Sequence, residues 1–551
     1  MANNMNEFIK ALDFNGMTLT ENGALTNKST GAVLTDQFGK AANYRGRSID
    51  EVFADQKALW FADQKALWDE DADKALRFPF YLRMITRKTK VNDENTTDKV
   101  QKGQGARDEA FKRLLWIAAF HPESFYKNIW VLPLIGSWKD IWTLLFYDVE
   151  FKVNTLKKDV MFELIKQGLL CHTHVDLIKK FMPRIKSNGK CKTSWTRVTN
   201  QLAKDFANYN KMSYEDYNHL KTSGSAHDFQ KAICAKRFDD LEWSKIPGRA
   251  LNQLTNSKFL ENHGLEKNYT EWVVKQPTAK FTGYVYELGH QVIKSIYGYR
   301  YGYGTINVPL YKKVTWNKQF DELIRKAQED DKITGNVWCA LDTSGSMTSP
   351  VVGDISAYDI CISLGVFFST LNKGAFNKNV IMFDNESHVK QLHGDFTDMI
   401  TDIVHSDTAW GSTNFQSVVD EIVRIRKENP SIPLEDYPKT LLVVSDMQFN
   451  PSGSNETNYE TAKAKLATVF PKEWVDEFKF IWWDCTSRKS DFPATLDDGG
   501  CYFMSGFDGS IISMLCGEEV EAKEMLEKKS ITMEEVIDSA LNQEILNYIK
   551  L

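Results

Sequence analysis

The chain has 551 residues, a formal net charge of −6, 42% hydrophobic and 12% aromatic residues. A single hydrophobic core stops growing at roughly 250–300 residues, so we expect at least two domains, and the aromatic content excludes a disordered chain. No apolar run reaches the roughly 18 residues of a membrane span, and residues 1–7 lack the basic start of a signal peptide, which predicts a cytoplasmic protein. Eight cysteines without a C-x-x-C pair argue against a disulfide scaffold or a zinc finger.

The charge is divided unevenly along the chain. Residues 81–320 contain 39 Lys and Arg against 23 Asp and Glu, a net charge of +16. Residues 321–551 contain 20 against 39, a net charge of −19. A positive region of this size attracts polyanions, although the two regions could instead neutralise each other across an interface.

The first 48 residues have few periodic apolar positions and read as an extended leader. The octapeptide FADQKALW then occurs twice in succession, at 53–60 and 61–68, and we assign no function to it. Apolar residues at helical spacing predict an all-helical domain over 49–325, plausibly of stacked helix pairs. The helices are expected at 75–86, 106–120, 138–146, 156–169, 174–182, 196–206, 228–236 and 283–296. Between them, residues 96–106 read as a flexible basic loop.

From residue 326 to 518 the pattern changes to alternating strands and helices, followed by a helical tail over 519–551. Strands are expected at 337–341, 380–383, 440–444, 478–483 and 501–504, and helices at 357–371, 415–426, 458–469 and 510–516. This alternation predicts a largely parallel sheet covered on both faces, the α/β arrangement of a Rossmann-like domain. The predicted fold class is therefore α plus α/β. Ligands in such sheets bind outside the carboxyl ends of the strands.

Oxygen-bearing side chains stand at three such places. Asp342, Ser344 and Ser346 follow the first predicted strand in the segment DTSGSM, and a loop with this alternation can aim three oxygens at one point. Thr413 in GSTNF opens a helix, and Asp446 in VVSDMQF ends another strand. Divalent cations such as Mg²⁺ prefer oxygen ligands of this kind, so all five groups are candidates for one metal site.

These three segments, in this order and spacing, resemble the metal-ion-dependent adhesion site of a von Willebrand factor A (vWA) domain. The resemblance implies that Ser344, Ser346 and Thr413 supply hydroxyl ligands, while Asp342 and Asp446 act through coordinated water. One metal position is then left for an acidic group of a partner. The implied cofactor is a divalent cation, Mg²⁺ first and Mn²⁺ or Ca²⁺ as alternatives, in a protein that is not an enzyme.

The resemblance extends upstream through TLTENGA, FPFYLRMITR, GQGARDEAFKRL, LPLIGSWKDIW and FDDLEWSKIPGRAL. These segments look like uncharacterised vWA proteins of phages, bacteria, fungi and plants, which are similar in turn to the TROVE module of Ro ribonucleoproteins. That module is a ring of HEAT-like helical repeats closed by a vWA domain. The resemblance implies an RNA-binding scaffold, a ring made by one chain that holds small noncoding or single-stranded RNA. For a phage-encoded protein the expected place is the host cytoplasm.

The candidate RNA contacts are the clustered cations of the basic region, which would meet phosphates and give salt-dependent binding with modest sequence selectivity. They are Arg87, Lys88, Lys90, Lys102, Arg107, Arg184, Lys186, Lys190, Lys192, Arg197, Lys236, Arg237, Lys245 and Arg249. Each of them, taken singly, could equally be part of a solvated helix face.

Two other functions remain open at this stage. The protein could be an interaction adaptor without nucleic acid, chaperone-like or associated with a virion, whose metal site grips an acidic residue of a partner. It could also be a metal-dependent nuclease, although no separate general base is evident from the sequence.

Overall fold

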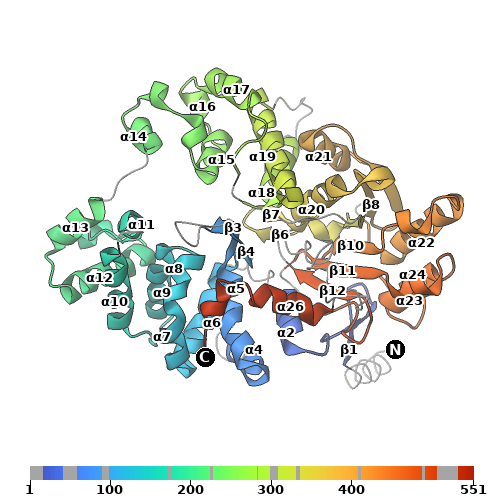
Figure 1. The fold of residues 1–551 in the computed structure, drawn as a ribbon, viewed down its shortest axis with the longest axis horizontal. Coiled ribbons are helices and arrows are strands. Elements are labelled where there is room, and N and C mark those ends of the chain that lie inside the picture. Colours follow the sequence, from blue (N-terminus) through green and yellow to red (C-terminus); the bar gives the residue numbers. More distant parts are fainter. Residues whose placement is uncertain are drawn as a thin grey trace. The chain divides into compact units, whose positions relative to one another are not determined.

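The structure is a computed structural model, shown in Figure 1, in which the chain forms two compact units. Unit 1 comprises residues 1–47 and 243–538, and unit 2 comprises 48–242 and 539–551. These limits differ from the predicted domain boundaries at 325/326 and 518/519. The described residues are 16–40, 59–89, 99–171, 175–223, 228–281, 283–297, 308–329, 336–406, 411–486, 491–505 and 532–551. No helix in these ranges is long and apolar enough to cross a membrane.

Unit 1 is built on a six-stranded sheet in the order β12-β11-β10-β5-β8-β9. Five neighbouring strands are parallel, and β9 pairs antiparallel with β8 at one edge. This confirms the predicted helical region followed by a mostly parallel sheet. The bounds are β5 Trp338–Asp342, β8 Asn379–Phe383, β9 Ser387–Gln391, β10 Thr440–Ser445, β11 Lys479–Asp484 and β12 Cys501–Ser505. Strand β9 was not predicted; its side chains are exposed or half-buried, so no apolar pattern marks it.

The order of the strands creates a switch point between β5 and β10. From β5 the chain continues toward β8 on one side, whereas from β10 it continues toward β11 on the other. Parallel connections are right-handed, so helices that follow β5 and helices that follow β10 cover opposite faces of the sheet. Between these two strands the loops at the carboxyl ends diverge, and open α/β sheets bind their ligands there.

The helices of unit 1 divide accordingly. Helix α20 packs on β5, β8 and β10, and behind it lie α18, α19 and α21. Gly289 of α18 permits this contact, because a Cβ there would lie 1.8 Å from the hydroxyl of Ser363 on α20. The bounds are α15 Gly248–Asn256, α16 Phe259–Asn262, α17 Glu266–Val274, α18 Val285–Tyr297, α19 Leu310–Glu329, α20 Ala357–Leu371, α21 Phe396–Val404, α22 Phe415–Glu428, α23 Asn458–Leu466 and α24 Lys472–Asp476. A short hairpin, β6 Pro350–Val352 and β7 Ile355–Ser356, precedes α20.

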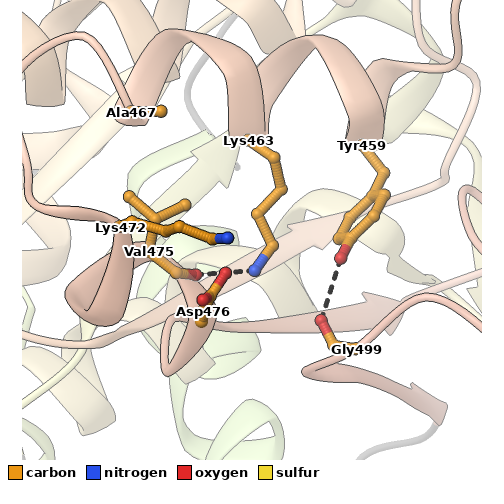
Figure 2. A pocket seen from close by; sticks show the side chains of 7 residues that line it. All are labelled: Tyr459, Lys463, Ala467, Lys472, Val475, Asp476 and Gly499. Carbon is orange, nitrogen blue, oxygen red and sulfur yellow. Dashed lines mark hydrogen bonds between the residues drawn. The ribbon is translucent and has the colours of Figure 1, made fainter.

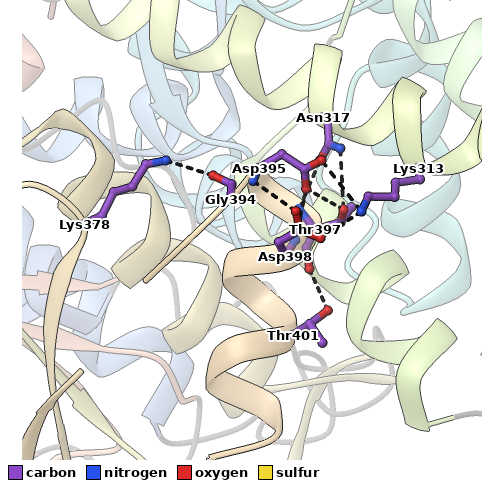
Figure 3. A network of polar contacts seen from close by, with 8 residues as sticks. All are labelled: Lys313, Asn317, Lys378, Gly394, Asp395, Thr397, Asp398 and Thr401. Atoms are coloured by element: carbon purple, nitrogen blue, oxygen red, sulfur yellow. Dashed lines mark hydrogen bonds and ion pairs between the residues drawn. The ribbon is translucent and has the colours of Figure 1, made fainter. Parts of the chain in front are cut away.

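A polar network joins α19 to the start of α21 (Figure 3). Asp395 caps α21 and accepts a hydrogen bond from the backbone N–H of Asp398. The Lys313 ammonium on α19 lies 2.7 Å from Asp398, and its contact with that carboxylate raises the pKa of the lysine. Asn317 accepts a hydrogen bond from the backbone N–H of Thr397. The helix dipole favours the carboxylates of Asp395 and Asp398 at the N-terminus of α21. Their contacts with Lys313, and the hydrogen bond to Asn317, hold α21 against α19.

Residues 16–40 belong to the fold of unit 1, in contrast to the predicted extended leader. They form the hairpin β1 Met17–Leu19 and β2 Leu25–Asn27, followed by helix α2 Val33–Lys40, which packs on β12. Asn27 also pairs with Phe492. The segment escaped prediction because its strands have three residues each, too few to show a period.

Unit 2 is mainly helical, as predicted. Its core contains a contact chain of aromatic rings: Trp142 and Phe162 pack on Phe206, which packs on Tyr217. The second octapeptide copy lies in α4, where Gln64 and Leu67 are buried. The helices are α4 Leu59–Glu70, α5 Ala72–Arg83, α6 Arg107–Phe120, α7 Pro122–Asn128, α8 Leu132–Ile135, α9 Trp138–Glu150, α10 Lys158–Leu170, α11 Val175–Phe181, α12 Ser194–Tyr209, α13 Tyr214–Thr222 and α14 Asp228–Cys234.

Two features of unit 2 differ from the all-helical expectation. Strands β3 Ile85–Thr89 and β4 Lys99–Gln104 form an antiparallel hairpin where a helix end and a flexible basic loop were expected. The C-terminal segment then packs on the same unit: Gln543 exchanges two hydrogen bonds with the backbone of Lys102, and Asn128 exchanges two with Lys550. Because these contacts join residues more than 400 positions apart, no local pattern reveals them.

Candidate metal site on unit 1

Asp342 is the last residue of the central strand β5 and is fully buried. Its Oδ1 accepts a hydrogen bond from the backbone N–H of Ser344 at 2.9 Å, and its Oδ2 accepts one from the hydroxyl of Ser445 at 2.5 Å. Ser445 ends β10, the neighbouring strand. Both oxygens of this carboxylate are therefore held by groups at the carboxyl ends of the two strands that flank the switch point, Ser344 in the loop after β5 and Ser445 at the end of β10.

The loop after β5 turns back on itself and brings two hydroxyls together. The Oγ atoms of Ser344 and Ser346 lie 3.1 Å apart, and Ser346 also hydrogen-bonds Asp446. The loop continues as a short 3₁₀ turn over Gly345–Thr348. The alternation seen in the sequence thus places Asp342, Ser344 and Ser346 along one path that leads to Asp446.

Thr413 is buried in the loop that opens helix α22. Backbone hydrogen bonds tie this loop to the other two: Gly345 donates to the carbonyl of Gly411 at 3.3 Å, and Asn450 donates to the carbonyl of Thr413 at 2.8 Å. The three segments singled out from the sequence therefore form one rim, although their role as ligands of a metal stays a prediction.

Asp446 follows β10 directly and is only 8% exposed. Its Oδ1 accepts a hydrogen bond from the backbone N–H of Gln448. The intervening Met447 has φ +60°, a left-handed conformation that costs free energy for a residue other than glycine. Its N–H donates to the hydroxyl of Ser445. The backbone is therefore bent sharply where it presents Asp446.

Two buried carboxylates so close together oppose each other's ionisation. Burial raises the pKa of Asp342, and the charge of Asp446 raises it further against the hydrogen bonds from Ser445 and Ser344. Burial likewise raises the pKa of Asp446, whereas its hydrogen bonds with Ser346 and Gln448 lower it. An opposite charge at this rim would favour the ionised forms of both groups.

The donor set fits a hard divalent cation. Among the described residues, no basic side chain forms an ion pair with Asp342 or Asp446, and the rim adds the hydroxyls of Ser344, Ser346 and Thr413. Nowhere in the described ranges do three His, Cys, Asp or Glu side chains cluster as a metal site would require. A cation here would therefore depend on hydroxyl oxygens as well as on the two carboxylates, which Mg²⁺ accepts because it needs only one or two carboxylates nearby.

Three polar residues that shape this rim were not among the predicted site residues. Ser445 and Gln448 stand inside the quoted VVSDMQF segment and orient the two carboxylates. Asp384, just after β8, accepts a hydrogen bond from the N–H of Gly411 and so holds the Thr413 loop. Its place after a strand of the same sheet is the signal that could have identified it.

The predicted RNA-binding cations do not share one environment. Lys245 and Arg249 belong to unit 1, and the rest to unit 2. Arg107 is committed to an ion pair with Asp108, 2.8 Å away. Lys102 is held by its backbone to Gln543. Arg87 and Lys88 lie on β3, and Lys90 lies outside the described residues, as do 298–307 and most of the first octapeptide copy.

A second group of these cations is exposed. Five of them lie in the loop between α11 and α12 and at the start of α12: Arg184, Lys186, Lys190, Lys192 and Arg197. Among the described residues, none of the five has an ion-pair partner. We call this set the 184–197 cluster. Lys221 lies near this cluster: burial, and then the positive charge of Arg184, lower the pKa of that lysine. Lys236 and Arg237 after α14, and Lys245 and Arg249, are also exposed.

A pocket of about 460 Å³ lies at the other end of the sheet (Figure 2). Tyr459 and Lys463 on α23 line it with Lys472, Asp476 and Gly499. The Lys463 ammonium donates a hydrogen bond to the carbonyl of Val475 at 2.6 Å, and the Tyr459 hydroxyl donates one to the carbonyl of Gly499. The pocket adjoins the amino ends of β11 and β12, where parallel sheets do not place their ligands. The carboxyl-end rim is therefore the stronger candidate site.

Comparisons with known proteins match part of the chain to a family without an assigned function. Residues 337–547 match the model of DUF7788, a domain of unknown function. No curated protein matches the chain. Among solved structures, the chain is similar to the Ro (RSR) protein of Deinococcus radiodurans, with 13% sequence identity and a TM-score of 0.38 over 89% of this chain and 99% of that one.

Proposed function

We propose that the protein is a non-catalytic binding scaffold that captures an acidic group through a divalent cation on unit 1 and holds RNA on unit 2. The observation that carries the first part is the pair of buried carboxylates, Asp342 and Asp446, which the described residues leave without a basic partner at the switch point of the sheet. Buried charges in proteins are paired or coordinate metals.

In this proposal Ser344, Ser346, Thr413 and the two carboxylates hold the cation, Mg²⁺ in the first place. The bound ion supplies a positive charge that attracts a carboxylate or phosphate oxygen of the partner. Hydrogen bonds orient the two carboxylates for the ion. The Ser445 hydroxyl and the backbone N–H of Ser344 hold Asp342, and the backbone N–H of Gln448 holds Asp446. We assign binding rather than hydrolysis to this site, and no residue of it the role of a general base.

Binding of a cation is tested by titrating Mn²⁺ into the metal-free protein and into Asp342→Asn. We expect the wild type to bind Mn²⁺ and the variant to lose at least about tenfold in affinity. Equal affinity in both proteins would reject the metal site. Circular dichroism of the two metal-free proteins serves as the control for folding.

The 184–197 cluster supports the RNA part of the proposal. Its five cations are exposed, unpaired among the described residues, and gathered within fourteen positions of a region with a net charge of +16. Phosphates bound by such side chains release counterions. On a single strand, the logarithm of the affinity therefore falls by about 0.7 per phosphate contact for each tenfold increase in salt concentration. A scaffold of this kind reads the backbone of RNA rather than its bases.

RNA binding is tested with a labelled hairpin RNA that carries a single-stranded tail, titrated across a salt series. The triple variant Lys186→Gln, Lys190→Gln, Lys192→Gln should bind more weakly, with a salt slope reduced by about 2. The matched control neutralises three exposed lysines of unit 1, Lys373, Lys427 and Lys472. Equal losses in both triple variants, or no binding at low salt, would reject the RNA part.

The rim by itself supports a second candidate, an adaptor that binds an acidic protein partner without nucleic acid. It requires only the carboxylates and hydroxyls of unit 1. The two experiments separate the candidates, because an adaptor binds Mn²⁺ in an Asp342-dependent manner and shows no affinity for the hairpin RNA.

A further inference from the structure

The pocket of Figure 2 is built by two helices and one loop of unit 1. Helix α23 supplies Tyr459 and Lys463, α24 supplies Lys472 and Asp476, and Gly499 stands just before β12. The volume of about 460 Å³ is in the range of roughly 300–1,000 Å³ that small-molecule sites occupy. The rule that ligands bind at the carboxyl ends of parallel strands concerns the loops that follow those strands. Because helices form most of this pocket, the rule does not exclude it as a binding site.

Lys463 brings a half-buried charge to this pocket and forms no ion pair within the described part of the chain. Its ammonium donates one hydrogen bond, to the carbonyl of Val475 at 2.6 Å, and lies 5.9 Å from the centre of the Tyr459 ring. An ammonium has three N–H donors, so further donors remain for water or a ligand. Burial lowers the pKa of this lysine, against the charge of Asp476. A bound anion would therefore stabilise the charged form of Lys463.

A second lysine faces the same space. Lys472 is the first residue of α24, is exposed, and has no ion-pair partner in the described ranges. Figure 2 shows its side chain reaching into the pocket from α24, as that of Lys463 does from α23. Of the residues that line the pocket, Asp476 alone is acidic, so the lining has an excess of positive charge. Two ammonium groups on separate helices match a group with close to two negative charges, and a phosphate monoester carries such a charge near pH 7.

We propose that this pocket binds a small, hydrophilic phosphate monoester, with its phosphate between Lys463 and Lys472. Lysine binds phosphate as a point charge on a flexible stem, so both ammonium groups can approach the phosphate oxygens. Asp476 then accepts hydrogen bonds from hydroxyl groups of the ligand. The small residues Ala467 and Gly499 leave room for it, since a Cβ at Gly499 would meet no atom within 4 Å. This inference depends neither on the cation nor on the RNA proposed above.

The test is equilibrium dialysis of the full-length protein against radiolabelled glycerol 3-phosphate, a phosphate monoester with free hydroxyl groups. We expect the wild type to bind it with a dissociation constant on the order of 1 mM or below. Lys463→Met and Lys472→Gln should each weaken binding about tenfold, because each removes one charge-assisted contact. The matched control is Lys427→Gln, which neutralises an exposed lysine on α22 of the same unit. Because Lys472 is exposed, its variant tests the pocket even if Lys463→Met fails to fold.

Two unlabelled competitors define the class of ligand. Glycerate carries a carboxylate in place of the phosphate, and inorganic phosphate lacks the hydroxyl groups, so both should compete more weakly than glycerol 3-phosphate itself. Asp476→Ala should bind inorganic phosphate more tightly than the wild type does, since a nearby negative charge is removed, and should no longer prefer the ester. Absence of saturable binding by the wild type, or equal losses in Lys427→Gln and the two pocket variants, would overturn the site. Glycerate that competes as well as glycerol 3-phosphate would overturn its assignment to phosphate.

Discussion

Two buried carboxylates of unit 2 have an arginine partner, whereas the carboxylate pair Asp342 and Asp446 of unit 1 has no basic partner among the described residues. In unit 2, Glu109 accepts from Arg113 at 2.8 Å and Asp140 lies 2.6 Å from Arg83, with all four side chains at least nine-tenths buried. In unit 1, Asp342 and Asp446 are equally hidden but meet only hydroxyls, backbone N–H groups and each other among the described residues.

This difference separates a structural role from a binding role. Glu109 is matched by a fixed cation of the same chain, Arg113, whose removal would leave a buried charge uncompensated. A pair of buried carboxylates without such a match carries negative charge that a bound cation can neutralise. The contrast can be tested by removing charge from each place in turn.

The largest effect is expected from Arg113→Met. Arg113 is 1% exposed and also donates a hydrogen bond to Gln64, so its loss leaves Glu109 buried beside only the more distant Lys112. We expect the free energy of unfolding to fall by about 3–5 kcal/mol, as measured by urea denaturation. The double variant with Glu109→Gln should recover much of this loss; an unchanged stability in the single variant would contradict the pairing.

Binding of the cation should raise the free energy of unfolding of unit 1, by somewhat less than the loss expected from Arg113→Met. A ligand present at 100 times its dissociation constant contributes about 2.7 kcal/mol to folding. We therefore expect the melting temperature to rise on addition of Mg²⁺ and to return on addition of a chelator. The rise should be absent in Asp342→Asn, whereas a rise that persists there would point to a cation bound elsewhere.

Asp342→Asn should stabilise the metal-free protein, by about 1 kcal/mol, the opposite sign to the loss expected from Arg113→Met. The substitution removes one of two buried like charges and keeps an oxygen for the N–H of Ser344. Thermal unfolding in chelator, compared with Asn450→Ala as a nearby control, measures the difference. A clear loss of stability would mean that the hydrogen bonds of Asp342 outweigh the repulsion.

The smallest effect is a pH dependence from His290 in unit 1. Burial favours its neutral form, yet the hydrogen bond and charge of Asp359, with the charge of Asp354, raise the pKa of the histidine. A raised pKa in the folded state means that the stabilisation is complete below the ordinary value and is lost as pH rises through the folded value. The stability gap between wild type and His290→Gln should therefore shrink from about pH 5.5 to 8.5, and a gap constant with pH would contradict it.

Local pattern accounts for much of the fold. The buried runs before Asp342 and Asp446 are strands because four to six consecutive apolar residues bounded by polar ones fit a strand covered on both faces. The 3.6-residue spacing in unit 2 identified the region as helical. Neither pattern could reveal β3 and β4, because strands of five and six residues with several Lys, Gln and Gly residues have no apolar alternation.

Part of the candidate site could be predicted from the sequence. Asp342, Ser344 and Ser346 are neighbours in the chain, so their proximity follows from the loop alone. Thr413 and Asp446 required the strand order, which parallel topology constrains but does not settle. The contact between the β1–β2 turn and the loop after Asp446 could not be predicted, because it depends on three hydrogen bonds between residues more than 400 positions apart.

By itself, the sequence determined the charge segregation, the helical and α/β regions, and the oxygen-rich segments at the strand ends, since these depend on composition and on short-range spacing. Only the tertiary structure decided that the turn between β1 and β2 lies against Gln448 and Phe449, and that residues 539–551 pack with unit 2. Contacts of this kind join distant parts of the chain, and their free energy comes from complementary surfaces that exist only after both parts have folded.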